Sequence, residues 1–372
     1  MNILHVHSGN IFGGVERMLE TLAPATSGRA PLRSTFALCF EGPVAERLRT
    51  AGAAVHLLGE VHARQLAEIR QARRSLTGVL QSEQPDAVLV HSAWSQAIFG
   101  PTILNSRVPL VRWLHAPQPG PRLLEFWARR SRPALVLCNS HYTAAQGGAQ
   151  INGVAHSVLY PPAVMRSRRP DIRARVRASL DTQADSIVVV LAARLEAGKG
   201  QSVLIEALSH LADRNWEAWI IGGAQHADEH AYLDALRSRA RSAGLASRIR
   251  FLGQRNDVAD LLEAADVYCQ PNVTPDSFGL SFVEALSAGL PVVTTRLGAA
   301  AEIIDDSCGV LIEPGSTSTL RDTLATLIER ADQRRDLSAG ACERAREFCD
   351  LPRSIAKLAS EFARLSPVAH LT

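Results

Sequence analysis

One structural pattern occurs twice in this chain and restricts its fold more than any other feature. At residues 1–23, MNILHVHSGNIFGGVERMLETLA runs from an apolar strand through a glycine-containing loop into a helix with apolar residues at helical spacing. At residues 186–212, SIVVVLAARLEAGKGQSVLIEALSHLA follows the same plan. This repeat of a strand-loop-helix unit predicts two α/β domains of the same Rossmann-like type.

Short apolar segments continue the pattern in both halves of the chain. Each is long enough for a strand and is followed by a helical or polar segment. Continuous apolar strands that alternate with helices indicate parallel sheets covered on both faces, and such sheets bind ligands at the carboxyl ends of their strands. The expected strands are STFALCF, DAVLVH, PLVRWLH and ALVLCNS in the first half, and EAWIIGG, RIRFLG, ADVYCQP, LPVVTT and GVLIEP in the second.

Length and composition agree with two folded domains. The 372 residues provide for two domains of roughly 150 residues each, and a hydrophobic content of 46% can fill two cores. We expect the boundary where Pro161, Pro162 and Pro170 interrupt the alternation. Forty basic and 37 acidic residues give a formal charge of +3, which is too balanced for a protein that binds nucleic acid by charge alone.

Cysteine usage and the first residues favour a cytoplasmic protein. The six cysteines include no CxxC pair and are too sparse for a disulfide scaffold. The first strand-like residues begin at Asn2, which leaves no room for a signal peptide, and no apolar run reaches 18 residues. We therefore expect a soluble cytoplasmic protein that at most lies at the inner face of a membrane.

The loop of the second strand-loop-helix unit contains two basic residues. Arg194 and Lys199 lie between an apolar strand and a helix, with Gly198 and Gly200 on either side of the lysine. Backbone N–H groups at a helix N-terminus, a guanidinium and an ammonium together suit a diphosphate. The glycine spacing does not match a P-loop, and two solvated surface charges are an equally good interpretation of the loop alone.

The segment PDSFGLSFVEALSAGLPVV, residues 275–293, holds two acidic residues eight positions apart. Its apolar spacing predicts a helix that begins near Gly279, so that free N–H groups at its start point toward Asp276 and Glu284 lies one to two turns in. Carboxylates accept hydrogen bonds well from the vicinal hydroxyls of a ribose or a pyranose. The alternative is that Asp276 caps the helix and Glu284 is solvated.

Several of these segments together resemble a known family. RLEAGKGQSVLIEAL, VYCQPNVTPDSFGLSFVEALSAGLPVVTT, LGAAAEII and GVLIEPG resemble, in this order, the donor-binding half of the group 1 glycosyltransferases, which are retaining enzymes of the GT-B fold. The resemblance covers residues 186–330, and the first half agrees more loosely through HSGNIFGGVER, LHAP and CNS. It implies two Rossmann-like domains that face each other across a cleft. An acceptor-binding domain would span 1–165 and a donor-binding domain 166–351, with a C-terminal helix at 352–372 that crosses back to the first domain.

The resemblance also implies roles for individual residues. Arg194 and Lys199 would hold the donor diphosphate and neutralise the leaving group, Glu284 would bind the ribose, and Asp276 would contact the transferred sugar. Asp276 stands where the family usually has Glu, and Gly298-Ala299 stands where it commonly has Gly-Gly. The remaining implied contacts are a histidine beside the donor sugar, a glycine loop and backbone N–H groups near the sugar and phosphate, supplied by His115, Gly13, Gly14, Phe278, Gly279 and Leu280.

The implied reaction is retaining transfer of a sugar from a nucleotide diphosphate sugar, with UDP or GDP as the expected nucleotide, to a glycan, lipid-linked or small-molecule acceptor. No Asp-x-Asp occurs in the chain, so we expect no metal and no other cofactor. Three alternatives stay open. A nicotinamide oxidoreductase is disfavoured because the first loop lacks G-x-G-x-x-G. The other two are a nucleotide-sugar 2-epimerase on the same two-domain fold and, outside enzymes, a non-catalytic nucleotide- or glycan-binding protein.

Other residues of reactive type have simpler interpretations. His226 and His230 have spacing suited to zinc but no evident third ligand. His5 and His7 share one face of the first strand, where packing or a hydrogen bond is expected, and Arg112 is expected to be solvated. The basic segments 122–132 and 165–177 are either solvated faces or points of contact with anionic lipid.

Overall fold

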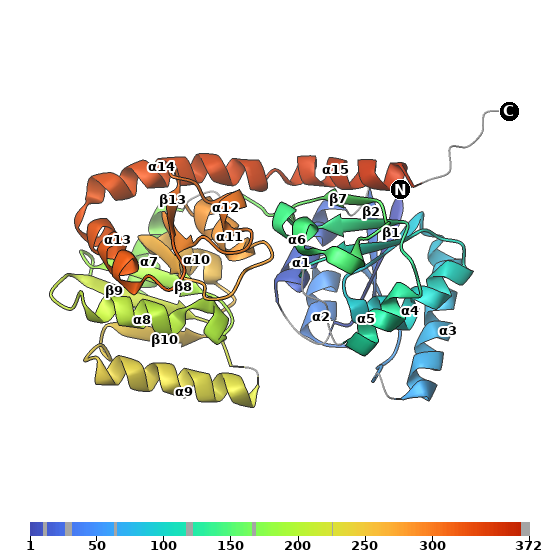
Figure 1. Ribbon diagram of the computed structural model, residues 1–372, viewed down its shortest axis with the longest axis horizontal. Helices are drawn as coiled ribbons and strands as arrows, with labels where there is room; N and C mark the ends of the chain where they lie inside the picture. The colour runs from blue at the N-terminus through green and yellow to red at the C-terminus, as the bar shows by residue number, and fades with distance from the viewer. Residues whose placement is uncertain are drawn as a thin grey trace. The chain divides into compact units, whose positions relative to one another are not determined.

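The structure is a computed structural model that describes residues 1–9, 13–26, 32–62, 65–116, 122–165, 169–224 and 226–365. The chain divides into two compact units (Figure 1). Unit 1 comprises Met1–Ala163 and Asp350–Thr372, and unit 2 comprises Val164–Cys349. A parallel sheet forms the centre of each unit, which confirms the predicted pair of Rossmann-like folds.

The sheet of unit 1 has the strand order β3-β2-β1-β4-β5-β6-β7, and its paired strands are all parallel. From β1 the chain continues to β2 and β3 on one side of β1, and it then returns to β4 on the other side of β1 and continues outward to β7. The direction of strand order therefore reverses between β1 and β4. The strands are β1 (Asn2–His7), β2 (Arg33–Leu38), β3 (Ala54–Leu57), β4 (Ala87–Val90), β5 (Leu110–Leu114), β6 (Leu135–Cys138) and β7 (His156–Val158).

Helices cover both faces of this sheet. Ile3 of β1 packs with α1, α2 and α15, whereas Leu4 and Val6 of the same strand pack with α3 and α4. Alternate residues of a strand point to opposite faces, so a strand buried on both faces is apolar throughout. The helices are α1 (Gly14–Ala25), α2 (Pro43–Thr50), α3 (Leu66–Glu83), α4 (Ala93–Asn105), α5 (Arg122–Arg129), α6 (His141–Gln146), the 3-10 helix η1 (Gly148–Gln150) and α15 (Leu351–Ala363).

Helix α15 returns to unit 1, as the resemblance implied. Ile355, Leu358 and Phe362 are buried in the core of the first sheet. Glu361 of the same helix accepts a hydrogen bond from Ser157 of β7 at 2.9 Å. The break before α15 is marked by Asp350, whose carboxylate caps the helix by accepting the Arg353 N–H at 2.9 Å.

Unit 2 has a six-stranded sheet with the order β10-β9-β8-β11-β12-β13, again with parallel pairs. The order reverses between β8 and β11. The strands are β8 (Ile187–Ala192), β9 (Trp216–Ile221), β10 (Ile249–Gly253), β11 (Val267–Gln270), β12 (Val292–Thr295) and β13 (Gly309–Ile312).

The helices of unit 2 bury their apolar stripes against this sheet. Leu204 and Leu208 of α8 share a core with Val189 and Leu191 of β8, as the helical spacing predicted. The helices are α7 (Pro170–Ser179), the 3-10 helix η2 (Ala197–Lys199), α8 (Gln201–Ser209), α9 (Ala227–Ser242), α10 (Val258–Ala264), α11 (Leu280–Ser287), α12 (Ala300–Ile303), α13 (Thr317–Glu329) and α14 (Ala331–Phe348).

The basic segment around α7 is largely used inside unit 2. Arg177 is buried and its guanidinium lies 2.5 Å from the Asp266 carboxylate, which also contacts Arg173 at 2.7 Å. These two arginines therefore fix α7 against the end of α10. The positions 166–168 of the same segment lie outside the described residues.

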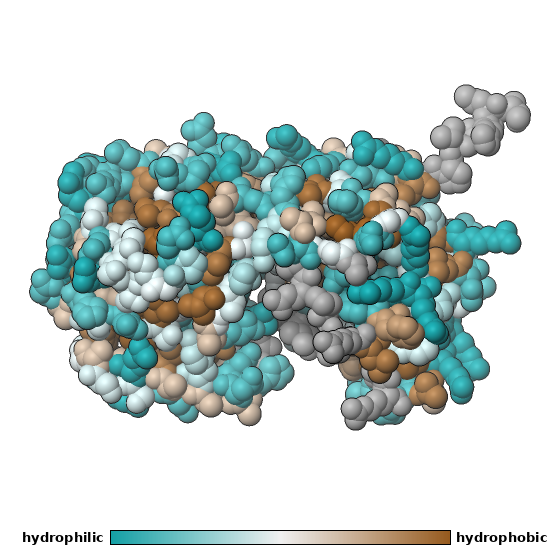
Figure 2. All heavy atoms as spheres, in the orientation of Figure 1, coloured by the Kyte–Doolittle hydropathy of each residue, from teal (hydrophilic) through white to brown (hydrophobic). Residues whose placement is uncertain are grey.

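The surface of each unit is mainly hydrophilic on the face that Figure 2 shows, with smaller apolar patches between the polar side chains. Within the described ranges, no helix combines the length and the apolar character that crossing a bilayer requires.

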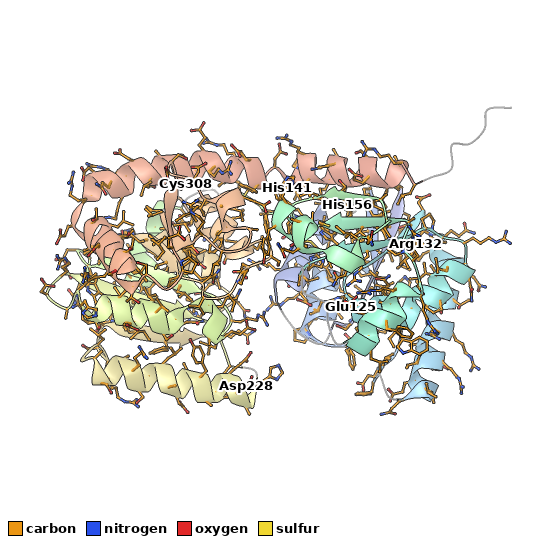
Figure 3. All side chains as sticks on the ribbon, viewed as in Figure 1. Glu125, Arg132, His141, His156, Asp228 and Cys308 are labelled. Carbon is orange, nitrogen blue, oxygen red and sulfur yellow. The ribbon has the colours of Figure 1, made fainter. Side chains whose placement is uncertain are left out.

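Arg112 contradicts the expectation of a solvated side chain. It lies in β5, is only 5% exposed, and its guanidinium contacts the carboxylate of Glu125 at 3.2 and 3.4 Å. Glu125, labelled in Figure 3, comes from α5 and is itself only 3% exposed. Helix α5 covers this position of the strand, and a charge buried in this way is stable only with its partner.

Replacing Glu125 with alanine should destabilise the protein by about 3 to 5 kcal/mol, because the Arg112 guanidinium would stay buried without its counter-charge. Urea unfolding followed by circular dichroism measures this change in the free energy of unfolding. The matched control is Glu41→Ala, which breaks an exposed ion pair with Arg49 and should leave the unfolding midpoint nearly unchanged. Equal midpoints for the two variants would contradict the importance of the buried pair.

Candidate active site

The reversal of strand order in unit 2 marks the place where a ligand is expected. The connections that follow β8 and β11 leave adjacent strands at the same edge of the sheet and then diverge, which opens a space at the carboxyl ends. The first connection carries Arg194 and Lys199, and the second carries Asp276. The topology therefore brings together residues that are 77 positions apart in the chain.

Lys199 and Asp276 form an ion pair at this reversal point. The ammonium group contacts carboxylate oxygen Oδ1, and both side chains are mostly buried, with 18% and 17% exposure. The other oxygen, Oδ2, accepts hydrogen bonds from Asn272 at 2.9 Å and from Gln270 at 3.2 Å. We refer to Lys199, Asp276, Gln270 and Asn272 as the lysine-carboxylate cluster.

Glycines allow the two connections to approach each other closely. A Cβ atom at Gly200, where φ is +77°, would lie 1.9 Å from the carbonyl oxygen of Pro271. A Cβ atom at Gly298 would lie 2.1 Å from the carbonyl oxygen of Asp276, which also accepts the Ala299 N–H at 2.9 Å. Only glycine fits at positions 200 and 298. The segment Gly198-Lys199-Gly200 and Gly298 therefore determine where the Asp276 carboxylate lies.

A buried polar network holds one amide of the lysine-carboxylate cluster in place. The Tyr268 hydroxyl lies 2.6 Å from the side-chain oxygen of Gln270, which also accepts a hydrogen bond from Ser281 at 3.2 Å. Burial raises the pKa of Tyr268 well above its ordinary value, and the nearby charges of Glu284 and Asp276 raise it further. Gln270 and Asn272 were not predicted as site residues from the sequence. The signal was available, because polar residues directly follow the apolar strand VYC.

Helix α11 begins where the sequence predicted. Its first residue is Leu280, and Gly279 precedes it with φ +98°, a conformation in which a Cβ atom would meet the ring of Phe282 at 2.4 Å. Glu284 lies in the second turn and is half-buried, and Phe278 is buried. The N–H groups in the first turn of a helix have no partner within that helix. Contacts of Phe278, Gly279, Leu280 and Glu284 with a ligand stay predictions.

Arg194 is not part of the lysine-carboxylate cluster in this structure. Its side chain is 55% exposed, and its ion-pair partner among the described residues is Glu196 at 2.6 Å. The backbone at Arg194 is held more firmly, because its carbonyl oxygen accepts a hydrogen bond from the buried Gln201 at 2.8 Å. Of the two expected cations, the structure places Lys199 beside Asp276 and leaves the Arg194 guanidinium on the surface.

In unit 1 the expected glycine loop precedes α1. Gly13 is the N-cap of the helix and its N–H donates to Glu16 Oε2 at 2.8 Å, whereas Gly14 is the first helical residue. The other oxygen of Glu16 lies 2.5 Å from His7 Nε2 at the end of β1. Burial raises the pKa of Glu16, but the contacts with His7 outweigh it and leave the pKa below its ordinary value. Glu16 thus connects Gly13 to the sheet, a contact that was not predicted from the sequence.

His115 directly follows β5 and belongs to a line of histidines. Its Nε2 lies 3.1 Å from Nδ1 of His91, and Nε2 of His91 lies 3.0 Å from Nδ1 of His5. Nε2 of His5 in turn lies 3.1 Å from the hydroxyl of Ser34. The expected hydrogen bond of His5 is confirmed, and His91 was missed although it ends the predicted strand DAVLVH.

All three rings have a lowered pKa, and His5 and His91 are buried whereas His115 is half-buried. Burial, followed by the neighbouring His7, lowers the pKa of His5 to about 3. Burial, followed by His7 and Arg112, lowers the pKa of His115 to about 3. The pKa of His91 also lies well below its ordinary value, chiefly because of burial. All three rings are therefore neutral at neutral pH.

The described ranges contain no group of three or more His, Cys, Asp or Glu side chains arranged to hold a metal ion. His226 and His230 are exposed, and the Glu229 carboxylate between them accepts the His226 N–H at 3.1 Å as a helix cap. This arrangement explains the acidic residue at that spacing by helix capping.

Family models match both halves of the chain. A model described as glycosyl transferases group 1 matches residues 172–344, and a model described as glycosyltransferase family 4 matches residues 12–152. The two matches lie in unit 2 and unit 1, respectively.

Curated relatives and solved structures agree with these matches. A phosphatidyl-myo-inositol mannosyltransferase of Mycobacterium leprae is 29% identical over 339 residues, which cover 77% of this chain and 88% of that protein. A D-inositol 3-phosphate glycosyltransferase of Corynebacterium glutamicum is 33% identical, but the match covers 47% of this chain and 43% of that protein. The crystal structure of Anabaena Alr3699/HepE in complex with UDP-glucose has the same fold, with a TM-score of 0.86, 24% identity, and coverage of 98% of this chain and 100% of that chain.

The low pKa of His5 and His115 predicts how stability depends on pH. Below pH 6.5 the unfolded chain binds protons at His5 and His115, whereas the folded protein does so only near pH 3. Their contribution is complete above pH 6.5 and is lost as the pH falls toward 3, by roughly 1.4 kcal/mol per pH unit for each histidine.

Denaturant unfolding between pH 7.5 and 5 measures this loss. His5→Phe should make the pH dependence shallower, because the variant has one titrating ring fewer. The control His230→Ala changes an exposed histidine and should leave the dependence as it is in the wild type. A wild-type stability that does not fall between pH 6.5 and 5 would contradict the neutral state of these rings.

Proposed function

The chain belongs to the group 1 glycosyltransferases, and on this premise we propose that it transfers a hexose from a UDP-sugar to a lipid-linked acceptor, with the lysine-carboxylate cluster at the donor. Membership of the family makes it a retaining glycosyltransferase that uses a nucleotide sugar. The observation that carries the residue assignments is the ion pair of Lys199 and Asp276 at the strand-order reversal of unit 2.

Lys199 supplies the charge that the reaction requires. Cleavage of the bond between the anomeric carbon and the phosphate develops negative charge on the departing diphosphate, so groups that stabilise this charge accelerate the step most. The ammonium is held by Asp276 at the carboxyl edge of the sheet before any ligand binds. Such preorganisation avoids the cost of arranging the charge during the reaction.

Arg194 would bind the diphosphate after its guanidinium leaves its present ion-pair partner. Its present partner Glu196 is 36% exposed, and exposed ion pairs contribute little to stability. The diphosphate carries one negative charge on each phosphate, and it offers the guanidinium a bidentate alternative to that carboxylate. We therefore assign Arg194 to the bound state, in which it neutralises the leaving group together with Lys199.

Asp276 would contact hydroxyl groups of the transferred sugar. Lys199 occupies Oδ1 and two amides occupy Oδ2, yet each carboxylate oxygen accepts more than one hydrogen bond. The side chain is one methylene shorter than the usual Glu, and the amides of Gln270 and Asn272 fix its position. Glu284 would bind the ribose, His115 the donor sugar, and the Gly13-Gly14 backbone the diphosphate.

Retention requires no separate protein base in this scheme. The acceptor attacks from the face that the diphosphate leaves, so the departing phosphate oxygen itself accepts the proton of the acceptor hydroxyl. The protein positions the two substrates and stabilises charge.

Three findings support the choice of substrates. Alr3699/HepE, whose fold this chain shares, was crystallised with UDP-glucose, and the Mycobacterium leprae relative is named for a phosphatidylinositol acceptor. In unit 1, α5 exposes Leu123, Phe126 and Trp127, and the Arg130 guanidinium lies 4.8 and 4.6 Å from the two aromatic ring centroids. Aromatic and basic side chains on one short segment suit the interface of an anionic membrane.

Replacing Lys199 with alanine should lower turnover by about 100 to 1,000-fold, the effect of removing one preorganised oxyanion donor. The assay is release of nucleotide from the sugar donor that a thermal-shift screen of UDP-, GDP-, ADP- and TDP-sugars identifies. Lys357→Ala is the matched control, because Lys357 is the other of the two lysines in the chain and is exposed on α15. Near-normal turnover by Lys199→Ala would refute the assignment, whether or not its melting temperature changes.

The double variant Phe126→Ala and Trp127→Ala should lose binding to vesicles that contain anionic phospholipid. Sedimentation at low and high salt measures the binding, and the wild type should bind less at high salt because screening weakens the contribution of the arginines. Leu66→Ala removes an apolar side chain from α3 that is more exposed than either aromatic residue, and it serves as the control. If the wild type does not sediment with the vesicles at low salt, the membrane part of the proposal fails.

A further inference from the structure

The line of histidines in unit 1 crosses four neighbouring strands of the sheet. Ser34 lies in β2 and His5 in β1, His91 follows β4, and His115 follows β5. The strand order β2-β1-β4-β5 places these side chains in succession, with separations of 3.1, 3.0 and 3.1 Å between their polar atoms. The planes of His5 and His91 differ by 6°, and those of His91 and His115 by 19°, which suits N–H···N hydrogen bonds in the ring planes.

Three neutral imidazoles in series have coupled tautomers. Each neutral ring carries one N–H donor and one acceptor nitrogen, so a bond at one nitrogen determines what the other nitrogen can do. If His5 donates from Nδ1 to His91, then His91 donates from Nδ1 to His115, and His115 must carry its own proton on Nδ1. The reverse order places every proton on Nε2 and leaves Nδ1 of His115 as an acceptor.

Ser34 selects between these two orders. Its buried hydroxyl has, among the described residues, no hydrogen-bond partner other than Nε2 of His5. If His5 donated to Ser34, the hydroxyl proton would be buried without an acceptor, which costs more than an unused lone pair. The hydroxyl therefore donates to His5, and every ring carries its proton on Nδ1.

We propose that Ser34, His5 and His91 are positioning residues that hold His115 as the Nδ1–H tautomer. No described residue occupies Nδ1 of His115, so this nitrogen presents a hydrogen-bond donor to a ligand. The oxygens of a sugar hydroxyl or of a sugar phosphate are acceptors of the matching kind. The role of this N–H group in binding rests on the proposed function, in which His115 contacts the sugar of the nucleotide sugar. The assignment of the tautomer does not depend on that function.

Nitrogen-15 NMR of the histidine-labelled, unliganded protein tests the tautomer directly. Wild-type His115, assigned by comparison with His115→Ala, should show a protonated Nδ1, and nitrogen–nitrogen couplings should connect His5 with His91 and His91 with His115. In His91→Phe, which keeps a planar ring, the Nδ1–H fraction of His115 should fall, because its Nε2 no longer accepts a bond. In His91→Asn the side-chain amide can still donate from nearly the same place, so the Nδ1–H form should persist.

A protonated Nε2 on wild-type His115, or the absence of both couplings, would overturn the proposal whether or not the protein turns over any sugar nucleotide. This readout needs no substrate, so a failure of the proposed function would leave it intact. Each variant is first compared with the wild type by thermal unfolding, and His91→Asn provides the measurement if His91→Phe does not fold.

Kinetics with UDP-glucose then test the consequence. His91→Phe should lower kcat about tenfold in the wild-type background and less than about twofold in the His115→Ala background, because His91 acts through His115. Equal losses in both backgrounds would mean that His91 serves only in packing and would contradict a positioning role. Normal turnover by His115→Ala would refute the contact with the sugar and would leave the NMR result to decide on the tautomer.

Discussion

The contact between Lys199 and Asp276 is the interaction on which the candidate site depends. A mostly buried ion pair loses hydration on both sides, and its attraction compensates only when further hydrogen bonds satisfy the charged groups. Here Gln270 and Asn272 bind the second carboxylate oxygen, and glycines at positions 200 and 298 let the backbone come close enough for this geometry. The charge that a diphosphate needs is thus held in place by parts of three connections of the same sheet.

Local patterns in the sequence were sufficient for much of the fold. The apolar runs predicted the strands, the restart at residue 186 predicted the second sheet, and the spacing after Gly279 predicted helix α11. Each of these signals depends on neighbours within about ten residues. The resemblance to the group 1 glycosyltransferases added the return of the last helix to the first unit, which no local pattern indicates.

Properties that depend on the packing of distant segments were not predicted. Arginine in a strand is ordinarily expected to be solvated. Only the position of α5 shows that Arg112 is buried against Glu125. The contact of Lys199 with Asp276 follows from the adjacency of β8 and β11, which the sequence does not specify residue by residue. His91 was visible as the last residue of a strand, but its importance arises from the strand order that places it between His5 and His115.

Helix α15 has a consequence for how this chain can be divided. Unit 1 is built from two separate stretches of sequence, and the second stretch supplies Ile355, Leu358 and Phe362 to its core. A fragment that ended before Asp350 would expose the apolar surface that these side chains cover, and it would be prone to aggregate. The two units therefore do not correspond to two consecutive halves of the sequence. A domain exchange that preserves the core of unit 1 must transfer both Met1–Ala163 and Asp350–Thr372.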